Sequence, residues 1–150
     1  MDVAGLLKWS TLTNKNKRFS PENDFIFFDV WTVQTNDGSA TIELWKYVSG
    51  APSGLNYTYN CHGYTFGDSK YWINGQINAI LSGDGYREII GADKKGAKVA
   101  YWGSDIHTAK VNTVDGVGNV TQVTGKLGAK ALLSSTPAGQ GYSGTIKYYE

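Results

Sequence analysis

The chain has 150 residues, with 14 basic and 13 acidic side chains and five Trp, ten Tyr and five Phe. This length suits one domain, and a hydrophobic content of 41% can form a real core, which excludes an intrinsically disordered chain. The net charge of +1 disfavours a general nucleic-acid binder, and the single Cys excludes a disulfide framework or a zinc site made of several thiolates.

Glycine is the outlier of the composition, with 19 residues beside only three prolines. Such an excess is typical of tight turns between β-strands. No segment reaches the roughly 18 apolar residues of a membrane span, and residues 1–12 lack the basic leader of a secretory signal. We therefore expect neither a signal peptide nor a membrane span. The protein would stay in the cytoplasm of the producing cell, leave it by a leaderless route, or be a domain cut from a longer chain.

The first part of the chain predicts an arm, a hairpin and a loop. Residues 1–24 are polar and basic and are expected to form a loose arm. Aromatic and β-branched residues on both sides of the turn signal Asn36-Asp37-Gly38 predict a β-hairpin over residues 25–48. The Gly, Pro and Ser residues of 49–59 then indicate a loop.

Helical signals follow in two places, and strands come after them. Residues 61–66 can form a short helical turn that ends at Gly67. Asn74 can cap a second helix, whose apolar residues share one face and which ends at Gly83-Asp84-Gly85. Strands are expected at residues 86–90, 97–102, 106–112, 119–124 and 144–149, with a turn at 113–118. The whole predicts a single α+β domain over residues 1–150 with a mostly antiparallel sheet.

The lone Cys61 is the candidate nucleophile, because it follows the loop directly and stands at the expected start of a helix. Unpaired N–H groups and the helix dipole at such a position stabilise a thiolate, which is the nucleophilic form. The alternative stays open that Cys61 is a small buried apolar side chain. The adjacent His62 diverges from Cys61 by about 100° on a helix, so it is expected to pack or to line a pocket rather than to act as the base.

His107 is the candidate base. It lies at the start of a predicted strand, on the apolar face that it shares with Ala109. An imidazole on a buried face needs a polar partner, so a structural histidine bonded to the backbone is the alternative. Gln122 or Asn119, on the strand that folds back against His107, can orient the ring. Gln122 is the preferred residue because it shares its face with Val120, which suits an inward position.

These residues stand in motifs that resemble one family. Asn60-Cys61-His62-Gly63-Tyr64 resembles the nucleophile motif of the NlpC-type papain-like cysteine peptidases, and most closely a Cys-His-Gly branch of that superfamily. Residues 96–102, 106–111 and 119–122 resemble the strands in which the family carries a Gly-Asp pair, its catalytic His and a third polar residue. The chain differs from the better-known members at Ala97, Ala109 and His62, where they have Asp, Gly and Ser.

The resemblance covers residues 54–149, which would be the catalytic core. It implies a papain-like (NlpC-type) fold, in which a short helix with the Cys packs on a mostly antiparallel sheet and the N-terminal β-hairpin is an extension. It also implies that Cys61 attacks an amide carbonyl, that His107 acts as base and then as acid, and that Gln122 holds the imidazole.

By the same resemblance, we expect a cysteine peptidase or amidase that cleaves a bond in peptidoglycan stem peptides, as a lytic enzyme or an antibacterial effector toxin. It would act on the cell wall of a target cell. The backbone N–H of the nucleophile and a hydroxyl of Tyr57 or Tyr59 would bind the oxyanion, with His62 beside the substrate. No cofactor and no metal is expected. The partners would be a peptidoglycan or protein substrate and, for an effector, an inhibitory immunity protein.

Two other functions stay open. The same Cys–His pair could serve a protease or deamidase toxin that acts on a protein. From a different class, the many aromatic residues could serve a non-catalytic module that binds glycans or proteins.

Overall fold

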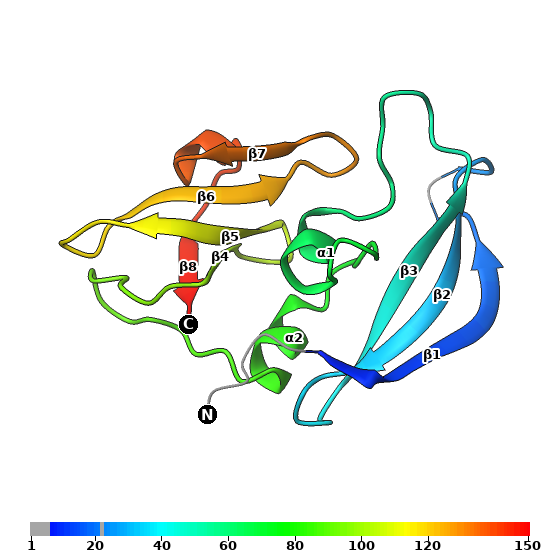
Figure 1. The fold of residues 1–150 in the computed structure, drawn as a ribbon, viewed down its shortest axis with the longest axis horizontal. Coiled ribbons are helices and arrows are strands. Elements are labelled where there is room, and N and C mark those ends of the chain that lie inside the picture. Colours follow the sequence, from blue (N-terminus) through cyan, green and yellow to red (C-terminus); the bar gives the residue numbers. More distant parts are fainter. Residues whose placement is uncertain (1–6, 22) are drawn as a thin grey trace.

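The computed structural model describes residues 7–21 and 23–150, and its architecture is α+β with antiparallel sheets, as the sequence predicts. Two sheets lie on either side of two short helices (Figure 1). The elements in chain order are β1 (Lys8–Phe19), β2 (Phe27–Gln34), β3 (Thr41–Ser49), α1 (Cys61–Phe66), α2 (Ile77–Gly83), β4 (Val99–Trp102), β5 (His107–Val114), β6 (Val120–Lys126), β7 (Leu132–Ser135), the 3-10 helix η1 (Ala138–Gln140) and β8 (Ile146–Tyr149).

The larger sheet has five strands in the order β7-β6-β5-β4-β8. Strands β4 to β7 follow one another as a meander, and η1 then leads to β8 (red in Figure 1), which pairs with the other edge of β4. One face of this sheet buries a small core around Trp102, Ala109 and Val123. The side chain of His107 lies on the same face, because His107 pairs directly with Trp102 across β4 and β5.

The smaller sheet has the order β1-β2-β3 and contains the predicted hairpin, in which β2 and β3 pair antiparallel. The expectation of a loose arm over residues 1–24 is wrong for residues 8–19, which form β1 along β2. Residues 1–6 and 22 lie outside the described residues. The strand was missed because only its first half, with Trp9 and Leu12, packs on the main core, whereas residues 13–18 are polar and exposed.

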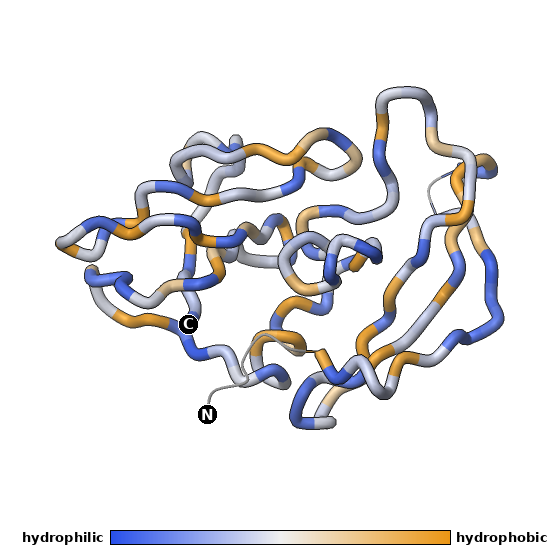
Figure 2. The backbone as a smooth tube through the Cα atoms, in the orientation of Figure 1, coloured by the Kyte–Doolittle hydropathy of each residue, from blue (hydrophilic) through white to orange (hydrophobic). Residues whose placement is uncertain are grey.

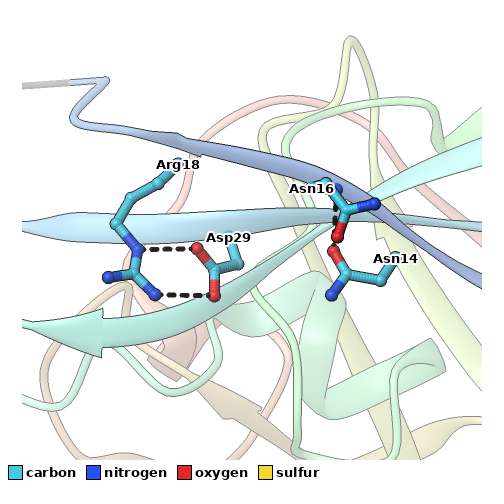
Figure 3. A network of polar contacts seen from close by, with 4 residues as sticks. All are labelled: Asn14, Asn16, Arg18 and Asp29. Carbon is cyan, nitrogen blue, oxygen red and sulfur yellow. Dashed lines mark hydrogen bonds and ion pairs between the residues drawn. The ribbon is translucent and has the colours of Figure 1, made fainter.

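Strand β1 pairs irregularly with β2, and its register shifts between Asn14 and Arg18. Asn16 has a φ of 55°, and its N–H donates to Oδ1 of Asn14 over 2.9 Å, which replaces the regular ladder (Figure 3). Arg18 then donates two hydrogen bonds to the carboxylate of Asp29, of 2.8 and 3.1 Å. An irregular, basic edge strand of this kind disfavours pairing with strands of other molecules.

The main core lies between the two sheets and encloses the apolar sides of both helices. It joins Leu44 of β3 to Ile77 and Ile80 of α2, and these to Val99 and Tyr101 of β4. Figure 2 shows apolar residues interspersed with polar ones along β2 and β3, as expected for strands that bury one face. The hairpin therefore shares its core with the helices.

The two helices differ in how well the sequence places their ends. Helix α1 spans residues 61–66, as predicted, and Gly67 caps its C-terminal end. Helix α2 begins at Ile77, not near Asn74, because Gln76 before it has a left-handed φ of 65° and no capping side chain of its own. Instead Oδ1 of Asp105, from the turn between β4 and β5, accepts the N–H of Ile77 over 3.2 Å. The cap thus comes from a distant part of the chain.

The remaining differences concern short elements at sheet edges. Residues 86–90 form no strand, and of these Glu88 makes an isolated bridge with Tyr149 of β8. Strand β7 and helix η1 lie in a stretch for which the sequence pattern predicts no element. Within residues 7–21 and 23–150, no helix combines the length and the apolar character that crossing a membrane requires.

Candidate active site

Helix α1 is anchored at its N-terminus by Asn60. Its Oδ1 accepts the N–H of Gly63 over 2.9 Å, as an N-cap does, and also the N–H of Ile73 over 3.1 Å. Its Nδ2 donates to the carbonyl of Ile73 over 2.8 Å. Because Gly63 has no Cβ, the helix can approach the backbone of Tyr71, whose carbonyl oxygen a Cβ would overlap. These contacts fix the position of Cys61, the first residue of the helix.

Cys61 lies where two strands of the large sheet separate. Residues 107–110 of β5 pair with β4, but β5 and β6 pair only from Lys110 and Thr124 onward. The backbone N–H groups of Thr108 and His62 lie near the thiol. The side chain is buried, with 6% of its surface exposed. Burial raises the pKa of the thiol, and these N–H groups and the positive charge of Lys126 act in the opposite direction.

His107 is fully buried, and one of its ring nitrogens is held by Gln140 of η1. Nε2 of His107 lies 2.9 Å from Oε1 of Gln140. The orientation of this amide is fixed, because its Nε2 donates to the carbonyl of Leu133 and to Oγ of Ser135, each over 2.9 Å. An amide oxygen only accepts, so Nε2 of His107 carries the proton and Nδ1 presents a lone pair. Burial lowers the pKa of His107 to about 4, so the ring is neutral at pH 7.

Nδ1 of His107 is buried and has no hydrogen-bond partner, which means that the imidazole and the Cys61 thiol are not bonded to each other in this structure. Two aromatic rings hold the imidazole in place. Tyr142 stacks on it with ring centroids 4.1 Å apart, and Trp102 contacts it edge-on at 4.9 Å. Nε1 of Trp102 is also buried without a partner.

The expectation that Gln122 orients His107 is wrong. Gln122 is exposed on β6, and it pairs with Thr113 well along the strand from His107. Asn119 is also exposed and donates to Asp115 in the turn before β6. The alternation of inward and outward side chains along β6 gave the wrong prediction for Gln122, because the register between β5 and β6 shifts on both sides of Thr113. The residue that contacts the imidazole, Gln140, comes from a 3-10 turn that has no periodic pattern.

His62 packs and lines the pocket, as predicted, and both of its ring nitrogens are engaged. Nε2 lies 2.9 Å from the carbonyl oxygen of Asp105, which can only accept, so it carries the proton. Nδ1 therefore accepts from the hydroxyl of Thr108 over 2.8 Å. Burial lowers the pKa of His62. The ring thus ties α1 to β5 as a neutral group, and it has no free nitrogen with which to deprotonate Cys61.

A pocket of about 240 Å³ opens beside Cys61. It is lined by residues 60–62 and 72–75, by 105–106, and by Gly128 and Tyr142. Tyr142 links this pocket to His107, since the residue lines the pocket of Cys61 and its ring stacks on the imidazole.

Neither tyrosine that was expected to bind the oxyanion lines this pocket. Tyr57 stacks on Trp72, with ring centroids 5.2 Å apart. Tyr59 stacks on Tyr64 at 6.3 Å and lies under the ammonium group of Lys126.

No family model matches the chain, and no match was found among curated proteins or among solved structures. The papain-like identity and the catalytic roles therefore remain predictions. Among the described residues, no three His, Cys, Asp or Glu side chains lie close enough together to hold a metal ion.

Proposed function

We propose that the chain is a cysteine hydrolase of amide bonds, in which Cys61 is the nucleophile and His107 the general base. The observation that carries the proposal is the state of the imidazole. Its Nε2 is held by Gln140, its Nδ1 is a buried acceptor with no partner, and Tyr142, which stacks on the ring, also lines the pocket of Cys61. A buried acceptor without a donor is disfavoured in a folded protein, and a catalytic role is one reason for which such a group is retained.

The chemistry begins with a neutral thiol and a neutral imidazole, because burial raises the pKa of Cys61 and lowers that of His107. On attack, the thiol proton passes to Nδ1 of His107 while sulfur bonds to the carbonyl carbon. The imidazolium then protonates the leaving amine, and the C–N bond breaks to leave a thioester on Cys61. Water, deprotonated by the neutral His107, hydrolyses the thioester and restores the thiol.

Two features of the site support this sequence of steps. The N–H groups of His62 and Thr108 lie near the sulfur, so they lie near the carbonyl oxygen that becomes an oxyanion. The pocket is smaller than the roughly 300 Å³ typical of sites for drug-sized ligands, so it suits a short segment of a peptide. Its rim carries Ile106, which is 51% exposed, as an apolar contact for that segment.

The motif resemblance favours peptidoglycan stem peptides as the substrate. The test is digestion of purified peptidoglycan by the wild type, by Cys61→Ala and by Gln122→Ala, with mass spectrometry of the soluble fragments. We expect new peptide termini from the wild type and from Gln122→Ala, and none from Cys61→Ala. If peptidoglycan stays intact but a protein is cleaved or deamidated only when Cys61 is present, the hydrolase stands and its substrate is a protein. Intact substrates of both kinds would overturn the proposal and favour a non-catalytic binding module.

A further inference from the structure

Lys126, at the end of β6, has its ammonium group buried beside the candidate site. The residue is 2% exposed. Its Nζ donates to the carbonyl of Asn56 over 2.7 Å and to the carbonyl of Gly128 over 2.6 Å. Lysine is almost never buried to this degree unless its charge is compensated.

Two of the groups around Nζ of Lys126 belong to residues of the wall of the Cys61 pocket. The ring of Trp72 lies 5.9 Å from Nζ, and Trp72 and Gly128 both line that pocket. The ring of Tyr59, two residues before Cys61, lies 4.9 Å away. The ammonium group of Lys126 is therefore in contact with residues that line the pocket in which the thiol lies.

No carboxylate compensates this charge. Among the described residues, the ion pairs join Arg18 to Asp29, Arg87 to Glu150 and Lys95 to Asp93, and none includes Lys126. Carbonyl dipoles and ring faces stabilise a buried cation only in part.

The titratable group that acts on Lys126 is Cys61. Burial lowers the pKa of Lys126 to about 8, and the negative charge that Cys61 can carry acts in the opposite direction. In return, Lys126 is the one charged side chain in the described part of the chain that acts on Cys61. Asp105 also lines the pocket of Cys61, and three further ionisable groups nearby are neutral at pH 7, because burial lowers the pKa of His62 and His107 and raises that of Tyr142.

We propose that the Lys126 ammonium group is the buried counter-charge of the Cys61 thiolate, and that it sets the fraction of thiolate present at neutral pH. Lys126 is thereby a positioning residue that acts through Cys61 and does not touch the substrate. This inference rests on the proposed function in that it concerns the same nucleophile.

The test is the rate of Cys61 alkylation by iodoacetamide between pH 5 and 10, measured in the wild type, Lys126→Met and Lys130→Met. Methionine keeps the unbranched stem of Lys126 without its charge. Lys130, an exposed residue of the turn after β6, provides the matched control. In Lys126→Met we expect the rate at pH 7, where the ammonium group of the wild type is charged, to fall about tenfold. The profile of Lys130→Met should coincide with that of the wild type.

An unchanged profile in a folded Lys126→Met protein, shown by its circular dichroism spectrum, would overturn the inference. Should the methionine variant fail to fold, Lys126→Gln retains a donor for the two carbonyls and is judged by the same criterion. The experiment contains no substrate, so its result is separate from that of the peptidoglycan digestion. A shifted profile without any hydrolysis would leave the role of Lys126 standing and remove the proposed function.

Discussion

The orientation of His107 depends on a chain of contacts that begins on the backbone of β7. The carbonyl of Leu133 fixes the amide of Gln140, and this amide fixes which nitrogen of His107 carries the proton. Gly125 on β6 makes room for the contact, because a Cβ there would lie 2.5 Å from Oε1 of Gln140 and 2.8 Å from Nε2 of His107. Glycine is therefore required at position 125 because there is no room for a Cβ, and not because the chain turns there.

Substitution of Gln140 should impair catalysis without removing either reacting group. In Gln140→Ala, the neutral imidazole can carry its proton on Nδ1, where it cannot accept the thiol proton. We expect the rate of Cys61-dependent hydrolysis to fall by about tenfold or more. Gln122→Ala is the control, since Gln122 is exposed and away from His107. Equal rates for both variants would show that Gln140 has no part in the site.

At the scale of single residues, the sequence predicts those candidate site residues whose positions follow from local patterns. Cys61 follows a loop and starts a helix, and His107 starts a strand, and both positions are where the structure has them. Gln140 could not be found in this way, because it reaches His107 through a 3-10 turn whose position depends on the packing of β7 against β6.

At the scale of elements, the C-terminal end of α2 is joined to the turn of the β2–β3 hairpin. The carbonyl of Gly83 accepts the N–H of Asp37 over 2.9 Å, and Oδ1 of Asp84 accepts the N–H of Asn36 over 2.8 Å. Oδ2 of Asp84 is buried without a partner. Burial, opposed by the Asn36 hydrogen bond and assisted by the charge of Asp37, raises the pKa of Asp84 to about 6.

This contact should make stability depend on pH. Because the pKa of Asp84 is higher in the folded than in the unfolded state, the folded protein binds more protons between about pH 4 and 6, and Asp84 destabilises it as the pH rises through 6. Asp84→Asn lacks this titration. We expect its free energy of unfolding, relative to the wild type, to increase by about 2 kcal/mol from pH 4.5 to pH 8 in urea denaturation.

The matched control for Asp84→Asn is Asp24→Asn, which replaces an exposed aspartate in the loop before β2. Its stability relative to the wild type should stay constant over the same pH range. A pH-independent difference between Asp84→Asn and the wild type would contradict a buried carboxyl at the end of α2.

Sequence patterns predicted the elements that bury a whole face and the edge strands β3 and β8, but they missed the edge strands β1 and β7. Ile77 and Ile80 revealed α2, and the alternation on both sides of Asn36-Asp37-Gly38 revealed the hairpin. Strands β1 and β7 each pair on one side only, and β7 has just four residues, so neither has a periodic apolar signal. The N-terminus of α2 was misplaced because Asp105, 28 residues after Ile77, supplies its cap.

At the scale of the whole molecule, one core connects the N-terminal sheet to the site. Leu44 of β3 and Ile73, whose backbone is bonded to Asn60, belong to the same buried cluster. The N-terminal sheet therefore supports the segment that anchors α1 and Cys61. We infer that the two sheets unfold as one cooperative unit.

Removing the side chain of Leu44, which is fully buried, tests this connection. Leu44→Ala should lower the free energy of unfolding by about 2–5 kcal/mol. The urea midpoint should shift equally for tryptophan fluorescence and for the reactivity of Cys61, because one transition exposes both. Val117→Ala, at an exposed position in the turn between β5 and β6, should change neither midpoint. Loss of the fluorescence signal while Cys61 stays protected would show that the sheets unfold separately.

The proposed mechanism requires that His107 activate Cys61. The most direct measurement is the rate at which iodoacetamide alkylates Cys61 at pH 7, followed by mass spectrometry, in the wild type and in His107→Phe. Phenylalanine keeps a ring that can stack on Tyr142 but has no nitrogen to accept a proton. We expect alkylation to be slower in His107→Phe by about tenfold or more. An equal rate in a folded His107→Phe protein would show that His107 is a structural residue of the sheet and that Cys61 has no base.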